Sequence, residues 1–251
     1  MVLNIWVKYM NKNTNKLEKI IIILLFTIII AIGAYFNIGE EDQKGNIVEN
    51  NKISYEISNI PEYIGETYVE INNNIPKFTN DDMNLKEDYY SELENGKVGV
   101  VMVKTCWKKA NEDDEKDDYS SITPSGFKQQ KYDTSIIPGG YLYHRCHLIA
   151  WKLGGIDVDK RNLMTGTQSF NVRGMKQFED KVYNYLKENQ TNHVLYRVTP
   201  YFKGNNELAS GVNIEAYSVE DKGELRFNVY VYNAQEGIDI DYATGESKLA
   251  E

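Results

Sequence analysis

The stretch Tyr143-His144-Arg145-Cys146-His147-Leu148-Ile149 decides how this 251-residue chain is interpreted. The chain has three histidines, and two of them lie in this heptapeptide. Its aromatic and aliphatic neighbours predict a strand that is half buried in a sheet. Because side chains alternate between the faces of a strand, we expect Arg145 and His147 on one face and His144 and Cys146 on the other. The first face suits phosphate chemistry, since arginine binds phosphate oxygens with a fork of donors and neutral histidine accepts a proton from water.

The same spacing argues against two other kinds of site. His144 and His147 would share one face of a helix and could then bind zinc together, but on a strand they diverge, and the sequence has no CxxC or HExxH motif. A Cys–His nucleophilic pair is disfavoured because Cys146 and His147 are adjacent and point to opposite faces. Taken alone, His147 could also be an ordinary core histidine, because buried polar groups are commonly just hydrogen-bonded.

A second strand and a helix are expected downstream of the motif. Residues 162–167 predict a short strand that ends in a turn. From Gln168 onward, apolar side chains recur with helical spacing and predict an amphipathic helix with Ser169 as its N-cap and an end near Glu188. Beyond this helix, aromatic or β-branched residues alternate with polar ones, which predicts antiparallel strands at residues 193–202, 211–220 and 224–233.

Two polar residues of the expected helix, Asn171 and Glu179, suit a hard divalent cation. Eight residues separate them, which places them about 80° apart around the helix axis, so both can face one cavity. Mg²⁺ keeps most of its waters and needs one or two protein oxygens in addition to substrate phosphate. An amide oxygen from Asn171, with Glu179 acting through bound water, meets that need. Without this context, Asn171 would be an ordinary polar residue near a helix start.

In combination, these residues resemble the DNA/RNA non-specific endonucleases with a ββα-metal (His-Me finger) core, in particular streptococcal-type secreted or anchored DNases and DNA-entry nucleases. The resemblance rests on Arg145-x-His147 followed by Asn162, Asn171 and Glu179, and it extends over roughly residues 55–247. The family signature is usually Asp-Arg-Gly-His, and related bacterial sequences have Asn-Arg-Cys-His. Here His144 and Cys146 occupy the two variable positions.

The resemblance implies an α+β fold, with the ββα-metal core on an antiparallel β-sheet, and a metal-dependent endonuclease that cleaves DNA, with RNA as a second candidate substrate. His147 would be the general base, Arg145 would contact phosphate, and Asn162 would be a second active-site asparagine. The metal would be Mg²⁺, with Mn²⁺ as an alternative, bound directly by Asn171 and supported through water by Glu179. In the predicted strand, His144 faces away from this site.

The N-terminal part of the chain predicts a membrane anchor. Residues 20–36 form an apolar run of 17 residues, at the short end of the length of about 17–25 that spans a bilayer. Lysines precede this run and acidic residues follow it, so the positive-inside rule keeps residues 1–19 in the cytoplasm. We therefore expect a single-pass anchor in a bacterial membrane, a linker at 37–59 and an extracellular nuclease domain at 60–251. The alternative is a cleaved signal peptide and a secreted domain.

The net charge of −9 is unusual for a protein that binds nucleic acid. Between Tyr141 and Lys187, however, eight lysines and arginines stand against four acidic residues, so this segment carries +4. That local excess favours a polyanionic substrate. A rival function uses the same basic surface: a catalytically weak envelope protein that binds nucleic acid for uptake or adhesion.

The two cysteines of the chain leave two interpretations open. In an exported domain, Cys106 and Cys146 could form one disulfide. Alternatively, Cys146 is a small buried residue on the strand face opposite His147.

Overall fold

The computed structural model describes residues 47–49, 52–110, 118 and 120–251. The segments expected to be cytoplasmic (1–19) and membrane-spanning (20–36) lie outside these residues. Within the described part of the chain, no helix has both the length and the apolar composition needed to cross a membrane.

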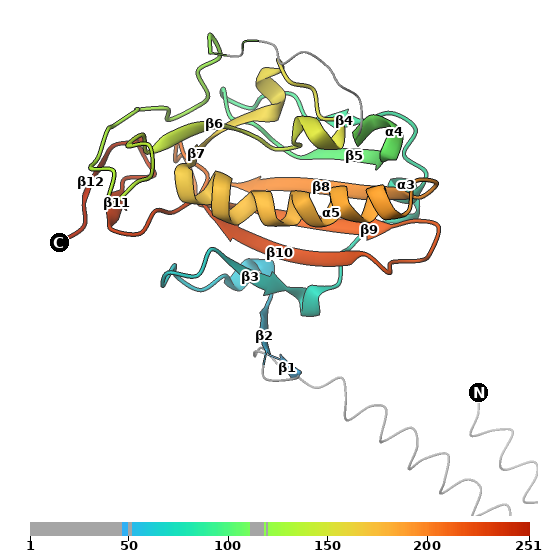
Figure 1. The fold of residues 1–251 in the computed structure, drawn as a ribbon. Coiled ribbons are helices and arrows are strands. Elements are labelled where there is room, and N and C mark those ends of the chain that lie inside the picture. The colour runs from blue at the N-terminus through green and yellow to red at the C-terminus, as the bar shows by residue number, and fades with distance from the viewer. Residues whose placement is uncertain (1–46, 50–51, 111–117, 119) are drawn as a thin grey trace, which may run out of the picture. The chain divides into compact units, whose positions relative to one another are not determined.

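A large, mostly antiparallel sheet forms the centre of the fold (Figure 1). Its strands, in spatial order, are β1 (Ile47–Glu49), β2 (Lys52–Tyr55), β3 (Tyr68–Ile71), β10 (Arg226–Tyr232), β9 (Gly211–Ser218), β8 (His193–Tyr201), β5 (Val101–Cys106) and β4 (Tyr89–Tyr90). Only the β2–β3 pair is parallel. The three strands expected after the helix are confirmed as β8, β9 and β10. Strands β1 and β2 lie within the stretch 37–59, which the sequence indicated as a linker.

The motif forms a separate two-stranded sheet. Strand β6 (Tyr143–His147) pairs antiparallel with β7 (Leu163–Thr167), and the register places His144 opposite Gly166 and His147 opposite Leu163. The expected strand is half buried, with Tyr143 and Cys146 as its buried residues. The expected order of two strands followed by a helix is therefore present, and the α+β fold with a large sheet is confirmed.

The helix after β7 begins differently from the sequence prediction. Its first full turn, η5 (Phe170–Met175), is a π-helix, and the regular helix α5 extends over Lys176–Glu188. Ser169 is buried, already has helical backbone angles and makes no side-chain cap. Instead, the Thr167 hydroxyl accepts a hydrogen bond from the backbone N–H of Phe170. A wider π-turn of this kind often marks a functional site.

Helix α5 covers the central strands of the large sheet (Figure 1). Phe178, Val182 and Leu186 form its buried stripe, as the helical spacing predicted, and they join one core with residues of β8, β9 and β10. Each such buried side chain contributes roughly 1.5–3 kcal/mol to the free energy of unfolding. Gly174 allows η5 to approach closely, because a Cβ atom there would lie 2.6 Å from Val231 Cγ1 of β10. The helix therefore packs closely against the sheet.

Short elements complete the fold. They are η1 (Ile57–Asn59), η2 (Asn72–Asn74), α3 (Asn80–Met83), α4 (Trp107–Ala110), η3 (Trp151–Leu153), η4 (Lys160–Asn162) and the hairpin of β11 (Ile238–Ile240) and β12 (Ser247–Leu249). Elements η3 and η4 lie in the loop between β6 and β7. Both cysteines are free, so of the two interpretations the structure has the buried thiol at Cys146.

Candidate active site

A hollow of about 370 Å³ lies where the end of β6, the β6–β7 loop and the start of the helix meet. Three residues singled out from the sequence line it together: His147 from β6, Asn171 from η5 and Glu179 from α5. The elements that bring them together are local in sequence, and the packing of α5 on the sheet fixes their relative positions. Arg145 and Asn162 do not line this hollow.

His147 is held by Asp157, a residue of the β6–β7 loop that sequence reasoning did not single out. His147 Nε2 lies 2.9 Å from the Asp157 backbone oxygen and 3.0 Å from its Oδ1 atom. Both side chains are about 15% exposed. Two acceptors at Nε2 select the tautomer that carries its proton there, so Nδ1 is the basic nitrogen of the neutral ring. The signal in the sequence was weak, since Asp157 follows a Gly-Gly turn like many loop aspartates.

Asn171 contacts His144, which corrects the expectation that His144 faces away from the site. Asn171 Nδ2 lies 3.1 Å from His144 Nδ1. Element η5 packs against the strand pair beside Cys146, and His144 lines a hollow together with Arg145 and Asn171. His147 is the last residue of the strand, and its ring lines the hollow from the strand end. Burial lowers the pKa of His144, which favours the neutral ring that can accept a hydrogen bond.

Glu179 supplies a carboxyl group in a largely buried position. Its side chain is 12% exposed, and Lys152 Nζ lies 4.0 Å from Oε2. Burial raises the pKa of Glu179 to about 7, and the charge of Lys152 opposes that shift. A carboxyl group in this state gains from any additional positive charge placed near it. The donor set of the hollow therefore fits a cation.

The number of ligands indicates which kind of cation fits. Among the described residues, no group of three or more His, Cys, Asp or Glu side chains could hold a metal ion by itself. One amide oxygen and one carboxylate suit a hard ion that keeps most of its water, such as Mg²⁺. The open hollow leaves room for those waters and for a phosphate group.

Arg145 lines a neighbouring hollow of about 400 Å³, which shares Asn171 with the first. Its Nε atom donates to the backbone oxygen of Ile122 at 2.6 Å, and its guanidinium group lies over the ring of Phe127. These contacts fix the Arg145 side chain at the second hollow, which is connected to the His147 hollow through Asn171.

Asn162 is fully buried and bonds to backbone only. Its Oδ1 accepts from the Ile149 N–H at 2.9 Å, and its Nδ2 donates to the carbonyl oxygens of Ile149 and Ile156. These bonds close the loop that carries Trp151 and Asp157. The family resemblance implied that the Asn162 side chain is part of the active site, whereas the structure places it away from the hollow, in contact with the loop backbone.

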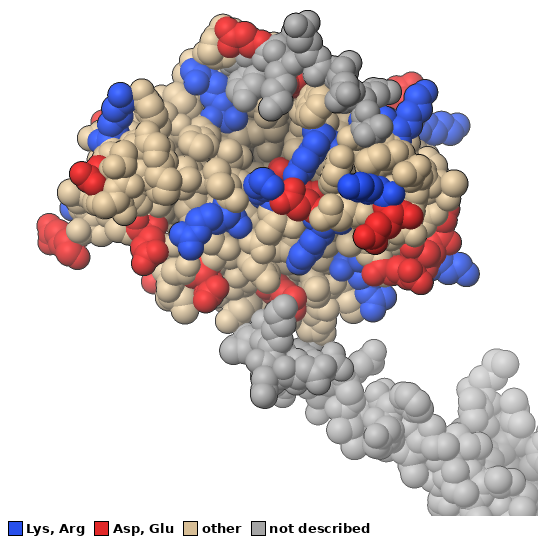
Figure 2. Space-filling view, in the orientation of Figure 1, with Lys and Arg blue, Asp and Glu red and all other residues tan. Residues whose placement is uncertain are grey.

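The charge of the site is more mixed than the count of residues indicated. Figure 2 shows lysine and arginine side chains interleaved with acidic ones across the face that carries α5. Asp180 contacts both Lys152 and Lys176, and Asp159 pairs with Arg161 at 2.6 Å. Part of the local positive charge is therefore neutralised within the protein.

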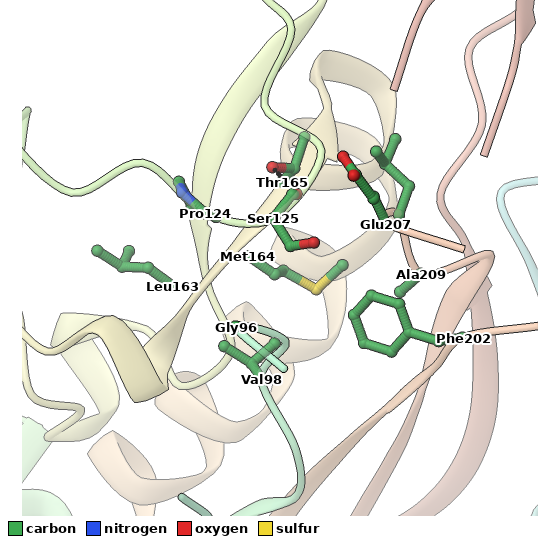
Figure 3. A pocket seen from close by; sticks show the side chains of 11 residues that line it. Gly96, Val98, Pro124, Ser125, Leu163, Met164, Thr165, Phe202, Glu207 and Ala209 are labelled. Atoms are coloured by element: carbon green, nitrogen blue, oxygen red, sulfur yellow. Dashed lines mark hydrogen bonds between the residues drawn. The ribbon is translucent and has the colours of Figure 1, made fainter. Parts of the chain in front are cut away.

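A third, much smaller cavity does not compete for a substrate. In Figure 3, Val98, Met164 and Phe202 are among the side chains that line it. Its volume of about 10 Å³ leaves room for about one water molecule. It is too small for a nucleotide.

A family model described as DNA/RNA non-specific endonuclease matches residues 78–220, more than half of the chain, and this range includes every residue of the His147 hollow. The chain belongs to this family. The resemblance found in the sequence is therefore confirmed, and nuclease chemistry on nucleic acid is the activity of the group.

Solved nucleases share the fold. NucA from Streptococcus agalactiae, in a crystal structure with magnesium bound, is 26% identical with a TM-score of 0.64, and the match covers 77% of this chain and 92% of that one. The Sda1 nuclease with bound zinc is 27% identical with a TM-score of 0.55, over 66% of this chain and 81% of that one. An extracellular endonuclease at 16% identity and a TM-score of 0.51 shares the fold.

Proposed function

We propose that this protein is a metal-dependent endonuclease that hydrolyses phosphodiester bonds of DNA without sequence preference, with RNA as a second candidate substrate. The observation that carries the proposal is that His147, Asn171 and Glu179 line one hollow. Strands β6 and β7 with the following helix would form the ββα-metal core.

His147 acts as the general base in this proposal. Asp157 holds the Nε2 proton, so Nδ1 takes the proton from the attacking water. Positioned general bases typically accelerate such steps by about 10²–10⁴-fold. The catalytic water would lie in the hollow between His147 and the phosphorus atom.

Asn171 would bind the metal through its amide oxygen, and Glu179 would hold the metal's water shell from α5. When bound, a divalent cation supplies positive charge to a phosphate oxygen and to the leaving oxygen. The oxygen donors favour Mg²⁺, or Mn²⁺ in its place, over a softer ion. The magnesium bound in NucA and the zinc bound in Sda1 support a divalent metal in the family.

Arg145 would contact a phosphate of the strand next to the cleaved bond. Its contacts with Ile122 and Phe127 fix the guanidinium group at a hollow that shares Asn171 with the reaction site. For Asn162, full burial favours a supporting role, in which its bonds hold the loop that presents Asp157.

A plasmid-nicking assay on the full-length chain tests the activity. We expect cleavage in Mg²⁺ that EDTA abolishes and that Mn²⁺ restores. Binding of DNA without any cleavage would favour the rival function, a nucleic-acid-binding envelope protein. EDTA-resistant cleavage would remove the metal from the mechanism.

We also propose that residues 20–36 anchor the protein in a bacterial membrane with residues 37–251 outside the cell. The support is the apolar run between lysines and acidic residues. Protease added to wall-stripped cells should digest the nuclease domain and spare a short N-terminal fragment. A protected domain would contradict this orientation, and a soluble product that begins near residue 35 would indicate a cleaved signal peptide.

A further inference from the structure

His144 lies where the motif strand and the start of the helix touch. It is paired with Gly166 on β7, and a Cβ atom at Gly166 would lie only 2.4 Å from Phe170 Cδ1 and 2.6 Å from Cys146 Sγ. Because glycine has no side chain there, η5 packs directly on the strand pair. That close approach brings Asn171 Nδ2 to 3.1 Å from His144 Nδ1.

The contact between Asn171 and His144 can determine which end of the Asn171 amide faces the hollow. An asparagine amide is planar, with an oxygen that can bind a hard cation and a nitrogen that cannot. The two ends have nearly the same shape, so packing alone does not select between the two orientations of Asn171. An acceptor opposite the nitrogen does, because it accepts a hydrogen bond from one N–H of the NH₂ group and turns the oxygen the other way.

We propose that His144 is a positioning residue, which fixes the Asn171 amide so that its oxygen faces the metal. The proposal rests on the metal-binding role proposed above for Asn171. His144 Nδ1 accepts the hydrogen bond from Asn171 Nδ2, and the ring therefore carries its own proton on Nε2. The residue acts through Asn171 and touches neither the metal nor the reacting atoms.

If His144 orients Asn171, only side chains with a hydrogen-bond acceptor at the same place can replace it. Any side chain that offers an acceptor at the same place should orient Asn171, so asparagine or aspartate should serve. Phenylalanine has a similar ring but no acceptor, and it should leave the amide free to turn. A hydrogen-bonding partner behind a metal ligand is typically worth about 10–100-fold in metal affinity.

The test is a calorimetric titration of Mg²⁺ and Mn²⁺ into the full-length chain in mild detergent. We expect His144→Phe to weaken binding by about 10–100-fold, while His144→Asn and His144→Asp retain most of the affinity. The matched control is His193→Phe, since His193 pairs with Glu220 on the large sheet and lies outside the site. Thermal unfolding of each variant checks that it is folded.

Two outcomes would overturn the proposal: unchanged affinity in a folded His144→Phe variant, or equal losses in His144→Phe and His144→Asn. Asn171→Ala, titrated in parallel, separates this failure from that of the proposed function. If Asn171→Ala leaves metal binding unchanged, the metal site itself is wrong. If Asn171→Ala weakens binding but His144→Phe does not, Asn171 is a ligand and His144 does not orient it.

Discussion

Asn162 and Asn171 have the same side chain and are nine residues apart, but they occupy opposite environments. Asn162 is fully buried, and its amide makes three hydrogen bonds to the backbone of the β6–β7 loop. Asn171 lines both hollows of the site and contacts the side chain of His144. The first asparagine holds the structure around the site, and the second presents its amide to the site. Residue type and spacing alone could not separate these two roles.

The largest expected effect is on the cleavage rate, at a residue that lines the hollow as Asn171 does. His147→Ala removes the proposed base and should lower the cleavage rate by about 10²–10⁴-fold. The variant should still fold, because His147 lines the hollow and is not part of the apolar core, while loss of its contacts with Asp157 should lower the free energy of unfolding by about 1–3 kcal/mol. Single-turnover cleavage of a labelled oligonucleotide, with denaturant unfolding of the same preparation, measures both. Near-wild-type cleavage by a folded variant would exclude His147 as the base.

Asn162 supports the loop around the site, so Asn162→Ala should mainly lower the free energy of unfolding. The change removes three hydrogen bonds and leaves the buried N–H and carbonyl of Ile149, and the partly buried carbonyl of Ile156, without this partner. A loss of about 2–4 kcal/mol in the free energy of unfolding is expected from such unsatisfied groups. Asn171→Ala is the matched control and should destabilise far less, since Asn171 is not buried. If both variants lost the same stability, the distinction between the two asparagines would fail.

Glu179 shares features with both asparagines, because its side chain is largely buried and also lines the hollow. Burial raises its pKa to about 7 from 4.5. The folded state therefore holds this proton more tightly, so stability is full below pH 4.5 and falls as pH rises to about 7. The loss amounts to roughly 3 kcal/mol over that interval, in metal-free protein.

Denaturant unfolding at pH 5 and pH 8, with a chelator present, measures this contribution. Glu179→Gln should lose less stability than the wild type between the two pH values, because glutamine does not titrate. Glu188→Gln, at an exposed position near the end of the same helix, is the control and should follow the wild type. Parallel curves for wild type and Glu179→Gln would contradict the raised pKa.

The sequence predicted the parts of the site that depend on local order. A strand ending in His147, a second strand and an amphipathic helix were enough to bring Asn171 and Glu179 to one cavity, because periodicity determines which side chains share a face. The family was also recognisable from the spacing of these residues.

Other parts depend on packing that no local pattern encodes. Asp157 lies in an irregular loop to which the Asn162 amide also bonds, and its contact with His147 depends on the path of that loop. The contact of His144 with Asn171 requires the close approach that Gly166 permits. The helix begins with the π-turn η5 and not with a regular α-helical turn. The spacing of apolar residues does not distinguish these two starts.

The smallest expected effect concerns Asp180, which lies next to Glu179 but is 40% exposed and pairs with Lys152 and Lys176 at the edge of the hollow. Exposed ion pairs of this kind contribute less than about 1 kcal/mol, so Asp180→Asn should hardly change stability.

Asp180→Asn should, however, free two lysines for substrate phosphates. DNA should then bind modestly more tightly at low salt, and the logarithm of affinity should fall more steeply with salt, by about one to two units of slope for two lysines. Glu188→Gln changes the net charge equally but lies away from the hollow. Equal salt slopes in these two variants would show that overall charge, and not the two lysines at the hollow, determines the affinity for DNA.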